Sequence, residues 1–153
     1  MIDINKERKA AVREAWKNER AHVRNGNGTR DWSLSEQRQI LAKGKANGYE
    51  GHHMKSVREY PQYAGDSKNI QFLNRNEHVN GAHKGSTQNP TNGYYDHKTG
   101  TMHDFGNRSP QAAQVQPLSS TSYSNVSKYK ASEKTSTPSK SSSQSKSKSG
   151  QER

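Results

Sequence analysis

Hydrophobic residues near the start of the chain recur with the spacing of one face of a helix. Val12, Trp16 and Val23 fall on a single stripe, and charged residues occupy most of the remaining positions. Asp3 can cap the first turn, so the pattern predicts a helix over residues 4–24. A helix with so narrow an apolar stripe needs a partner to pack against, because isolated helices are only marginally stable in water.

A second, shorter helix is predicted from a capping signal. Ser33 and Glu36 have the spacing of a capping box, in which each side chain accepts a hydrogen bond from the backbone N–H of the other residue. Leu34 and Leu41 lie seven residues apart, which places them on one face of a helix that ends near residue 43.

The middle of the chain consists of short extended segments separated by glycines. Residues 49–57 can form a strand and a turn, and residues 69–73 read as a second strand. A short helix that contains residues 77–79 follows. Residues 94–95 are then expected to pair with residues 102–105 in a terminal hairpin. The pattern therefore predicts an α+β fold, with helices first and strands afterwards.

The composition changes abruptly at Asn107. From there to residue 153 the chain consists mainly of Ser, Lys, Gln, Thr and Pro, which predicts a disordered basic tail. The whole chain has 25 Lys or Arg and 14 Asp or Glu, a net charge of +11. The 8 basic and 2 acidic residues of the tail contribute +6, which leaves +5 for residues 1–106. The net charge favours an anionic partner, nucleic acid before a membrane surface, although the segment expected to fold is only moderately basic.

Low hydrophobicity excludes some classes of protein. Only 25% of the residues are hydrophobic and the mean hydropathy is -1.38, so a core that fills the whole chain is not expected. No stretch approaches the roughly 20 apolar residues of a membrane-spanning helix. The first eight residues lack the apolar region of a secretory signal. Membrane insertion is therefore not expected, and the location is left open between the cytoplasm and delivery by a specialised secretion system.

The absence of cysteine directs attention to the histidines as ligands for a transition metal. Four of the seven lie within 32 residues, namely His52, His53, His78 and His83. Adjacent side chains on a strand point to opposite faces, so His52 and His53 are expected to have different roles. Two strands and a helix that carry His-His, Asn69 and His in this order would form a compact metal site.

Several segments resemble the signature of the GHH-type HNH nucleases. They are Gly48-Tyr49-Glu50-Gly51-His52-His53-Met54-Lys55-Ser56-Val57, Asp66-Ser67-Lys68-Asn69-Ile70-Gln71-Phe72-Leu73, Glu77-His78, and the flanking residues 30–33 and 89–94. The resemblance covers about residues 15–106. Domains of this family are typically the C-terminal toxins of bacterial polymorphic toxin systems and are paired with immunity proteins. The resemblance implies a ββα-metal fold and cleavage of nucleic acid, usually DNA, with RNA as the alternative substrate.

The resemblance also implies a role for each residue of the motif. His52 and His78 would bind a divalent metal, His83 would be a third ligand, His53 would be the general base, and Asn69 would hold the catalytic loop and orient His53. Phosphodiester hydrolysis needs a base that works near neutral pH and a cation where negative charge grows, which suits His and a metal. Zn²⁺, Mg²⁺ and Ni²⁺ all remain candidates.

Two basic residues flank the proposed site. Arg30 and Lys55 are expected to contact phosphates, and the alternative is that they are ordinary surface charges.

The spacing of the two helix histidines departs from the family pattern. That pattern places them at i and i+4 on one face, whereas His78 and His83 are five residues apart with Gly81 between them. On a straight α-helix this spacing rotates His83 away from the face of His78. Either Gly81 ends the helix and the chain bends back, or His83 contacts phosphate instead. Glu50 is a further candidate ligand, or a partner of a ligand.

These observations divide the chain into an N-terminal helical part (1–47), a nuclease core (48–106) and a basic tail (107–153). They favour a metal-dependent endonuclease that hydrolyses DNA. The rival is a non-catalytic, metal-stabilised DNA-binding module, which would need His52 and His78 but has no use for His53 beside an oriented Asn. A membrane-surface protein is the third alternative, and no basic amphipathic helix with a bulky apolar face supports it.

Overall fold

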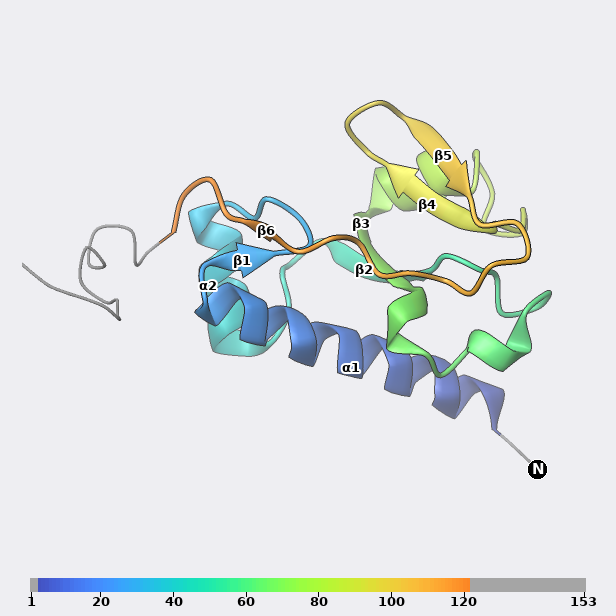
Figure 1. Ribbon diagram of the computed structural model, residues 1–153, viewed down its shortest axis with the longest axis horizontal. Coiled ribbons are helices and arrows are strands. Elements are labelled where there is room, and N and C mark those ends of the chain that lie inside the picture. Colours follow the sequence, from blue (N-terminus) through green and yellow to red (C-terminus); the bar gives the residue numbers. More distant parts are fainter. Residues whose placement is uncertain (1–2, 122–153) are drawn as a thin grey trace, which may run out of the picture.

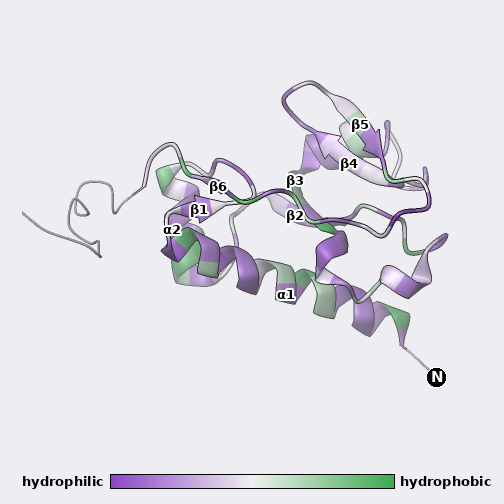
Figure 2. Ribbon diagram, in the orientation of Figure 1, coloured by the Kyte–Doolittle hydropathy of each residue, from purple (hydrophilic) through white to green (hydrophobic). Residues whose placement is uncertain are grey.

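The computed structural model of the chain describes residues 3–121. A long helix, α1, forms the base of the molecule, α2 lies beside its C-terminal end, and the strands lie above it (Figure 1). Polar residues dominate the ribbon, and the few hydrophobic segments include parts of α1, α2 and β3 (Figure 2). Within the described residues, no helix combines the length and the apolar character needed to cross a membrane.

Both predicted N-terminal helices are present. They are α1 (Ile4–Arg24) and α2 (Leu34–Lys43). The Asp3 side chain accepts hydrogen bonds from two backbone N–H groups of the first turn of α1. Ser33 and Glu36 form the complete capping box at the start of α2. The two helix starts are confirmed, because capping is a local interaction that the sequence spells out.

The strands in the described part of the chain form three small antiparallel sheets. They pair β1 (Asn27–Gly28) with β6 (Gln116–Pro117), β2 (Tyr49–His53) with β3 (Ile70–Asn74), and β4 (Gly93–Asp96) with β5 (Thr101–Asp104). Two short 3₁₀ helices, η1 (Pro61–Tyr63) and η2 (Ser67–Asn69), connect β2 to β3, and the π-helix η3 (Glu77–Ala82) follows β3. The α+β class, the strand pair followed by a helix, and the terminal hairpin are confirmed.

The core joins α1 and α2 to the β2–β3 sheet. The ring of Trp16 stacks on that of Phe72 with centroids 3.9 Å apart, and Trp32 packs beside both. At Gly51, a Cβ atom would lie 2.9 Å from both methyl groups of Val12. The glycine of the GHH motif therefore lets β2 lie directly on α1, which fixes the position of the two histidines that follow it.

The first part of the predicted tail packs against the fold. Residues 107–121 run back across the molecule from the β4–β5 hairpin to the helical end, where β6 pairs with β1 (Figure 1). Leu118 is only 8% exposed and belongs to the core, and the backbone N–H of Ser119 donates to Asp31 at 2.8 Å. The structure thus extends the fold beyond the predicted boundary at residue 107. The remainder of the predicted tail, residues 122–153, lies outside the described residues.

Candidate metal centre and catalytic cleft

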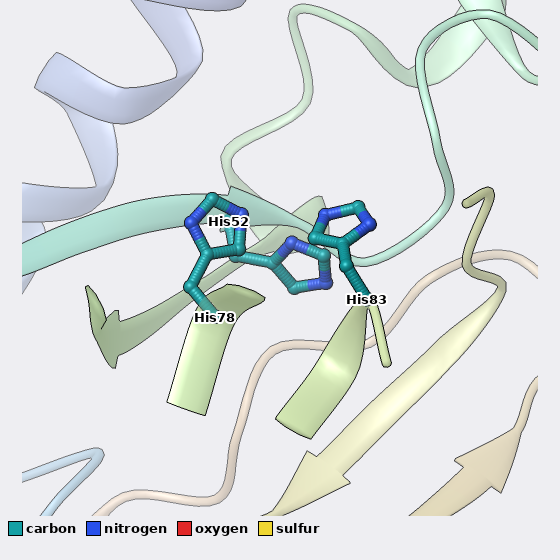
Figure 3. Close-up of side chains that lie close together, drawn as sticks. All are labelled: His52, His78 and His83. Atoms are coloured by element: carbon teal, nitrogen blue, oxygen red, sulfur yellow. The ribbon is translucent and has the colours of Figure 1, made fainter. Parts of the chain in front are cut away.

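Three histidine rings converge between β2 and η3. His52 extends from β2, and His78 and His83 extend from η3 and its C-terminal end. The three ring centroids are 4.9, 5.0 and 4.9 Å apart, and one nitrogen of each ring lies within 4.8 Å of the other two. Figure 3 shows the rings turned toward one another. The structure thus brings together all three residues that the sequence proposed as ligands.

The shape of η3 explains how histidines five residues apart share one face. The backbone N–H of His83 donates to the carbonyl of His78 at 3.0 Å, which is the i to i+5 bond of a π-helix. This wider turn brings residues i and i+5 close to the same face, whereas an α-helix would rotate them apart. The helix does not end at Gly81, as one of the two alternatives from the sequence had it, but continues to Ala82 as a π-helix, with the rings of His78 and His83 side by side. Single π-turns are frequent at functional sites.

Hydrogen bonds select which nitrogen can face an ion in two of the rings. Nδ1 of His78 lies 2.7 Å from a carboxylate oxygen of Glu50, and Nδ1 of His83 lies 2.7 Å from the Asn89 carbonyl. Because these acceptors require a proton on Nδ1, Nε2 of both rings is left free to bind a metal. Nε2 of His52 makes only a long contact of 3.5 Å to the Thr91 hydroxyl, and this contact does not decide which of its nitrogens would face an ion. Glu50 therefore lies against His78, one of the three expected ligands.

Burial favours the neutral form of two of the converging imidazoles, His52 and His83. Removal from water, with a smaller effect of the neighbouring histidines, lowers the pKa of His52 well below its usual value. Burial likewise lowers the pKa of His83, against an opposing hydrogen bond to the Asn89 carbonyl. Neutral imidazole is the form that binds a metal ion.

The three nitrogens fit a first-row transition metal. Zn–N bonds of about 2.0–2.1 Å hold ligand nitrogens no more than about 4.2 Å apart. The separations in the structure reach 4.8 Å at most, so small inward movements of the rings would close the site on an ion.

His53 takes a separate position beside this centre. Its Nε2 lies 2.9 Å from the carbonyl of Ala64, so the neutral ring carries its proton on Nε2. Burial lowers the pKa of His53, the Ala64 hydrogen bond opposes this, and the charge of Arg8 lowers it further. Within the described residues, Nδ1 of His53 has no hydrogen-bond partner and remains a proton acceptor.

Asn69 holds the loop that follows β2. Its fully buried side chain accepts a hydrogen bond from the backbone N–H of Lys55 at 2.8 Å and donates to the carbonyl of Lys55 at 3.0 Å. Its Nδ2 also lies 3.4 Å from the carbonyl of Tyr63, which precedes Ala64. The direct contact that orients His53 is therefore the Ala64 carbonyl, and Asn69 acts on the backbone around it.

The guanidinium of Arg30 is paired within the fold. Its guanidinium donates to both carboxylate oxygens of Glu77, at 2.9 and 3.1 Å, and to the Phe72 carbonyl at 3.0 Å. It also lies over the ring of Tyr49, 4.8 Å from the centroid. The sequence could not reveal that Glu77, 47 residues away, occupies these donors.

Lys55 is likewise engaged within the fold. Its residue is 1% exposed, and its ammonium donates to the Gly106 carbonyl at 3.0 Å. The ammonium also faces the rings of Tyr60, at 4.3 Å, and of Phe105, at 5.9 Å. The ammonium of Lys55 is thus held by contacts within the fold.

Two other arginines line the cleft that contains the histidines. This cleft has a volume of about 380 Å³, and it is lined by Arg8, Gly51, His52, His53, Ser56, Val57, Arg58, Glu59, His78, His83 and residues 87–90. Arg8 lies on α1, and Arg58 lies in the loop after β2, where its guanidinium is 3.4 Å from Gln88. Sequence analysis missed both, because Arg8 is one of many basic residues on α1 and reaches the cleft only through tertiary packing.

Comparison with known proteins finds a family similar in sequence to the first half of the chain. Residues 4–74 match the family model described as "GHH signature containing HNH/Endo VII superfamily nuclease toxin". This match covers just under half of the chain. The matched segment includes His52, His53 and Asn69, whereas His78 and His83 follow its end. The family resemblance inferred from the sequence is confirmed.

Curated relatives of the GHH domain are animal teneurins. The chain is 41% identical to mouse teneurin-3 over 75 residues, which is 48% of this chain and 3% of the teneurin. It is 38% identical to human teneurin-4 over 71 residues (46% and 3%), and 35% identical to Drosophila melanogaster teneurin-m over 65 residues (42% and 2%). The similarity therefore spans only a small fraction of each teneurin.

Proposed function

We propose that the chain is a metal-dependent endonuclease that hydrolyses phosphodiester bonds of DNA. The observation that carries the proposal is the convergence of three imidazoles on one side of a cleft that also contains His53. A metal-binding trio alone would serve a structural role equally well. A fourth histidine with a free Nδ1 in the same cleft supports catalysis.

The donor set narrows the choice of metal. Imidazole nitrogen suits Zn²⁺ and Ni²⁺, whereas Mg²⁺ prefers oxygen ligands and retains its waters. His52, His78 and His83 offer only nitrogen, so we favour Zn²⁺ or Ni²⁺ over Mg²⁺. When bound, such an ion supplies positive charge where the phosphate and the leaving oxygen become more negative. Glu50 holds the His78 ring in the orientation and tautomer that this requires.

His53 is the proposed general base. Its Nε2–H is held by the Ala64 carbonyl, so Nδ1 takes the proton from the attacking water. Asn69 keeps the surrounding backbone in place through its bonds to the loop after β2. Two adjacent residues of one strand thus have different proposed roles, because they point to opposite faces: His52 binds the metal, and His53 accepts a proton from the water.

Arg8 and Arg58 are the proposed phosphate contacts in place of Arg30 and Lys55. Both are exposed, both line the cleft, and neither forms an ion pair within the described residues. Glu59 is the acidic residue on the same lining, so the two arginines leave the cleft with an excess of positive charge. Contacts of this kind position a nucleic acid without selecting its sequence.

The match of residues 4–74 to a nuclease-toxin family supports a toxin-type role and an immunity protein as a partner. The teneurin relatives show that the same kind of domain also occurs within animal proteins of much greater length. That the chain is a bacterial toxin is proposed from the match to the nuclease-toxin family alone.

The test is nicking of supercoiled plasmid by the purified chain with Zn²⁺, Ni²⁺ or Mg²⁺, with a chelator control and an RNA substrate in parallel. We expect metal-dependent nicking of DNA that the chelator abolishes. His103→Ala is the matched control, because His103 lies on β5 outside the cleft with its side chain 63% exposed. Cleavage of RNA alone would change the proposed substrate, and DNA binding without cleavage under any metal would favour the non-catalytic module.

A further inference from the structure

The π-turn that unites His78 and His83 surrounds a glycine that has no room for a side chain. A Cβ atom on Gly81 would lie 2.5 Å from Cζ of Tyr95 and 2.7 Å from its hydroxyl oxygen. Real Cβ atoms do not approach other atoms this closely. The phenol end of Tyr95 therefore lies directly against the backbone of η3, at a point between the two histidines in sequence.

Tyr95 is itself fixed to the sheet that carries the third histidine. The side chain of Gln71 donates to the carbonyl of Tyr95 at 2.6 Å and accepts from its backbone N–H at 3.0 Å. Gln71 is buried on β3, and it is the direct cross-strand partner of His52. A continuous set of contacts thus runs from the strand that carries one proposed ligand to the turn that carries the other two.

This arrangement accounts for a turn that local preferences do not favour. π-turns are rare, and a glycine inside a helix costs about 0.5–1 kcal/mol relative to alanine. Nothing in the segment His78-Val79-Asn80-Gly81-Ala82-His83 selects the wider turn by itself. The ring of Tyr95 fills the space beside Gly81, so the wider turn is favoured only when the β4–β5 hairpin is in place.

We propose that Tyr95 is a positioning residue of the metal centre, holding the π-turn at Gly81 so that His78 and His83 meet His52. The proposal rests on the proposed metal binding. Tyr95 is not among the residues that line the histidine cleft, and it acts through the spacing of the ligands. The outer contacts of a metal site typically account for about 10–100-fold in affinity.

The main test replaces Gly81 with alanine in the full chain and measures Co²⁺ and Zn²⁺ affinity by titration calorimetry and the visible absorption of bound Co²⁺. Gly81→Ala leaves the hairpin intact and raises helix propensity, so the protein is expected to fold. Its methyl group collides with the phenol end of Tyr95, so either the ring leaves its place against η3 or the turn moves, and both disturb the support of the turn. We expect affinity to fall at least tenfold and the Co²⁺ spectrum to change, while the melting of the metal-free protein stays cooperative.

Variants of Tyr95 complete the design. Tyr95→Ala removes the support and should weaken binding to a similar degree, Tyr95→Phe keeps the ring and should bind like the parent, and Gly81→Ala/Tyr95→Ala should recover part of the affinity lost by Gly81→Ala. Tyr94→Ala is the matched control, because neighbouring residues on a strand point to opposite faces.

The outcomes separate this proposal from the proposed function. If the parent chain binds no metal, the proposed function fails first. If the parent binds metal and Gly81→Ala binds it as tightly with an unchanged spectrum, the positioning role of Tyr95 is wrong while the metal centre stands. Equal losses of affinity in Tyr95→Ala and Tyr94→Ala would also overturn it, since the effect would then belong to the hairpin as a whole.

Discussion

Replacing Arg30 with alanine is expected to destabilise the fold rather than to weaken a contact with DNA. Arg30 makes two hydrogen bonds to the carboxylate of Glu77 and one to the carbonyl of Phe72. The Arg30 and Glu77 side chains are only 12% and 16% exposed. Glu77 begins η3, the helix that carries two of the three converging histidines.

The expected loss in the free energy of unfolding follows from the partial burial of the Arg30–Glu77 ion pair. Removing one partner of a buried ion pair costs about 3–5 kcal/mol, because the other charge is left buried and unpaired. Here Glu77 keeps some exposure and a hydrogen bond from the backbone N–H of Asn74 at 3.0 Å, which reduces the penalty. We expect a loss of about 3 kcal/mol in the free energy of unfolding, or a fall of roughly 10 °C in Tm for a domain of this size.

The assay is urea and thermal unfolding of the metal-free protein, followed by tryptophan fluorescence. Arg75→Ala is the matched control, because Arg75 also pairs with a glutamate near the histidines, Glu50 at 3.3 Å, but has a side chain that is 74% exposed. An exposed pair of this kind contributes about 0–1 kcal/mol. Arg30→Ala could instead unfold at the same urea concentration and temperature as the parent and flatten the salt dependence of DNA binding. Arg30 would then be a phosphate contact, and its proposed role in stability would be refuted.

Three further changes test other parts of the structure. Lys55→Met should leave the salt dependence of DNA binding unchanged, because the enclosed ammonium reaches no phosphate, and a reduced slope in a filter-binding titration would contradict this. Leu118→Ala should cost about 2–3 kcal/mol in urea unfolding, whereas Val115→Ala, at a position 39% exposed, should cost less than about 0.5 kcal/mol; equal effects would mean that the C-terminal segment does not contribute to the core. Glu50→Gln should weaken Zn²⁺ binding about 10–100-fold in a competition titration by removing the carboxylate that holds the ring of His78, and unchanged affinity would argue against that role.

The helices and the histidine trio could be anticipated because their signals are local or lie in a recognisable motif. Asp3 and Ser33 cap helices through hydrogen bonds to residues two or three positions away, so the sequence contains both partners. The convergence of His52 with His78 followed from the order of strands and helix in the resembling family. The structure adds the geometry of this convergence, including which nitrogens are free.

The residues around the histidines were harder to predict, because their positions depend on contacts between residues far apart in the sequence. Arg30 and Lys55 read as free basic residues, because their partners Glu77 and Gly106 lie 47 and 51 residues further along the chain. The same limit hid Arg8, which reaches the cleft from α1 only after the helix packs on β2.

The π-turn and the C-terminal segment escaped prediction for a related reason. On an α-helix, the five-residue spacing of His78 and His83 would point the two side chains in different directions. We infer that they meet only because Tyr95 packs against Gly81 and holds the wider turn. The segment 107–121 has the composition of a tail, yet it is held on the fold by β6, by the buried side chains of Pro110 and Leu118, and by hydrogen bonds such as that from Ser119 to Asp31. Average composition does not report single buried side chains.

The most direct test of the central claim is the rate of plasmid nicking by His53→Ala under conditions in which it binds metal with the stoichiometry of the parent. General-base catalysis contributes roughly 10²–10⁴-fold, so we predict at least a 100-fold slower rate with unchanged metal content. A variant that cuts as fast as the parent would contradict the proposed mechanism, because the ion site would then suffice without a base at His53.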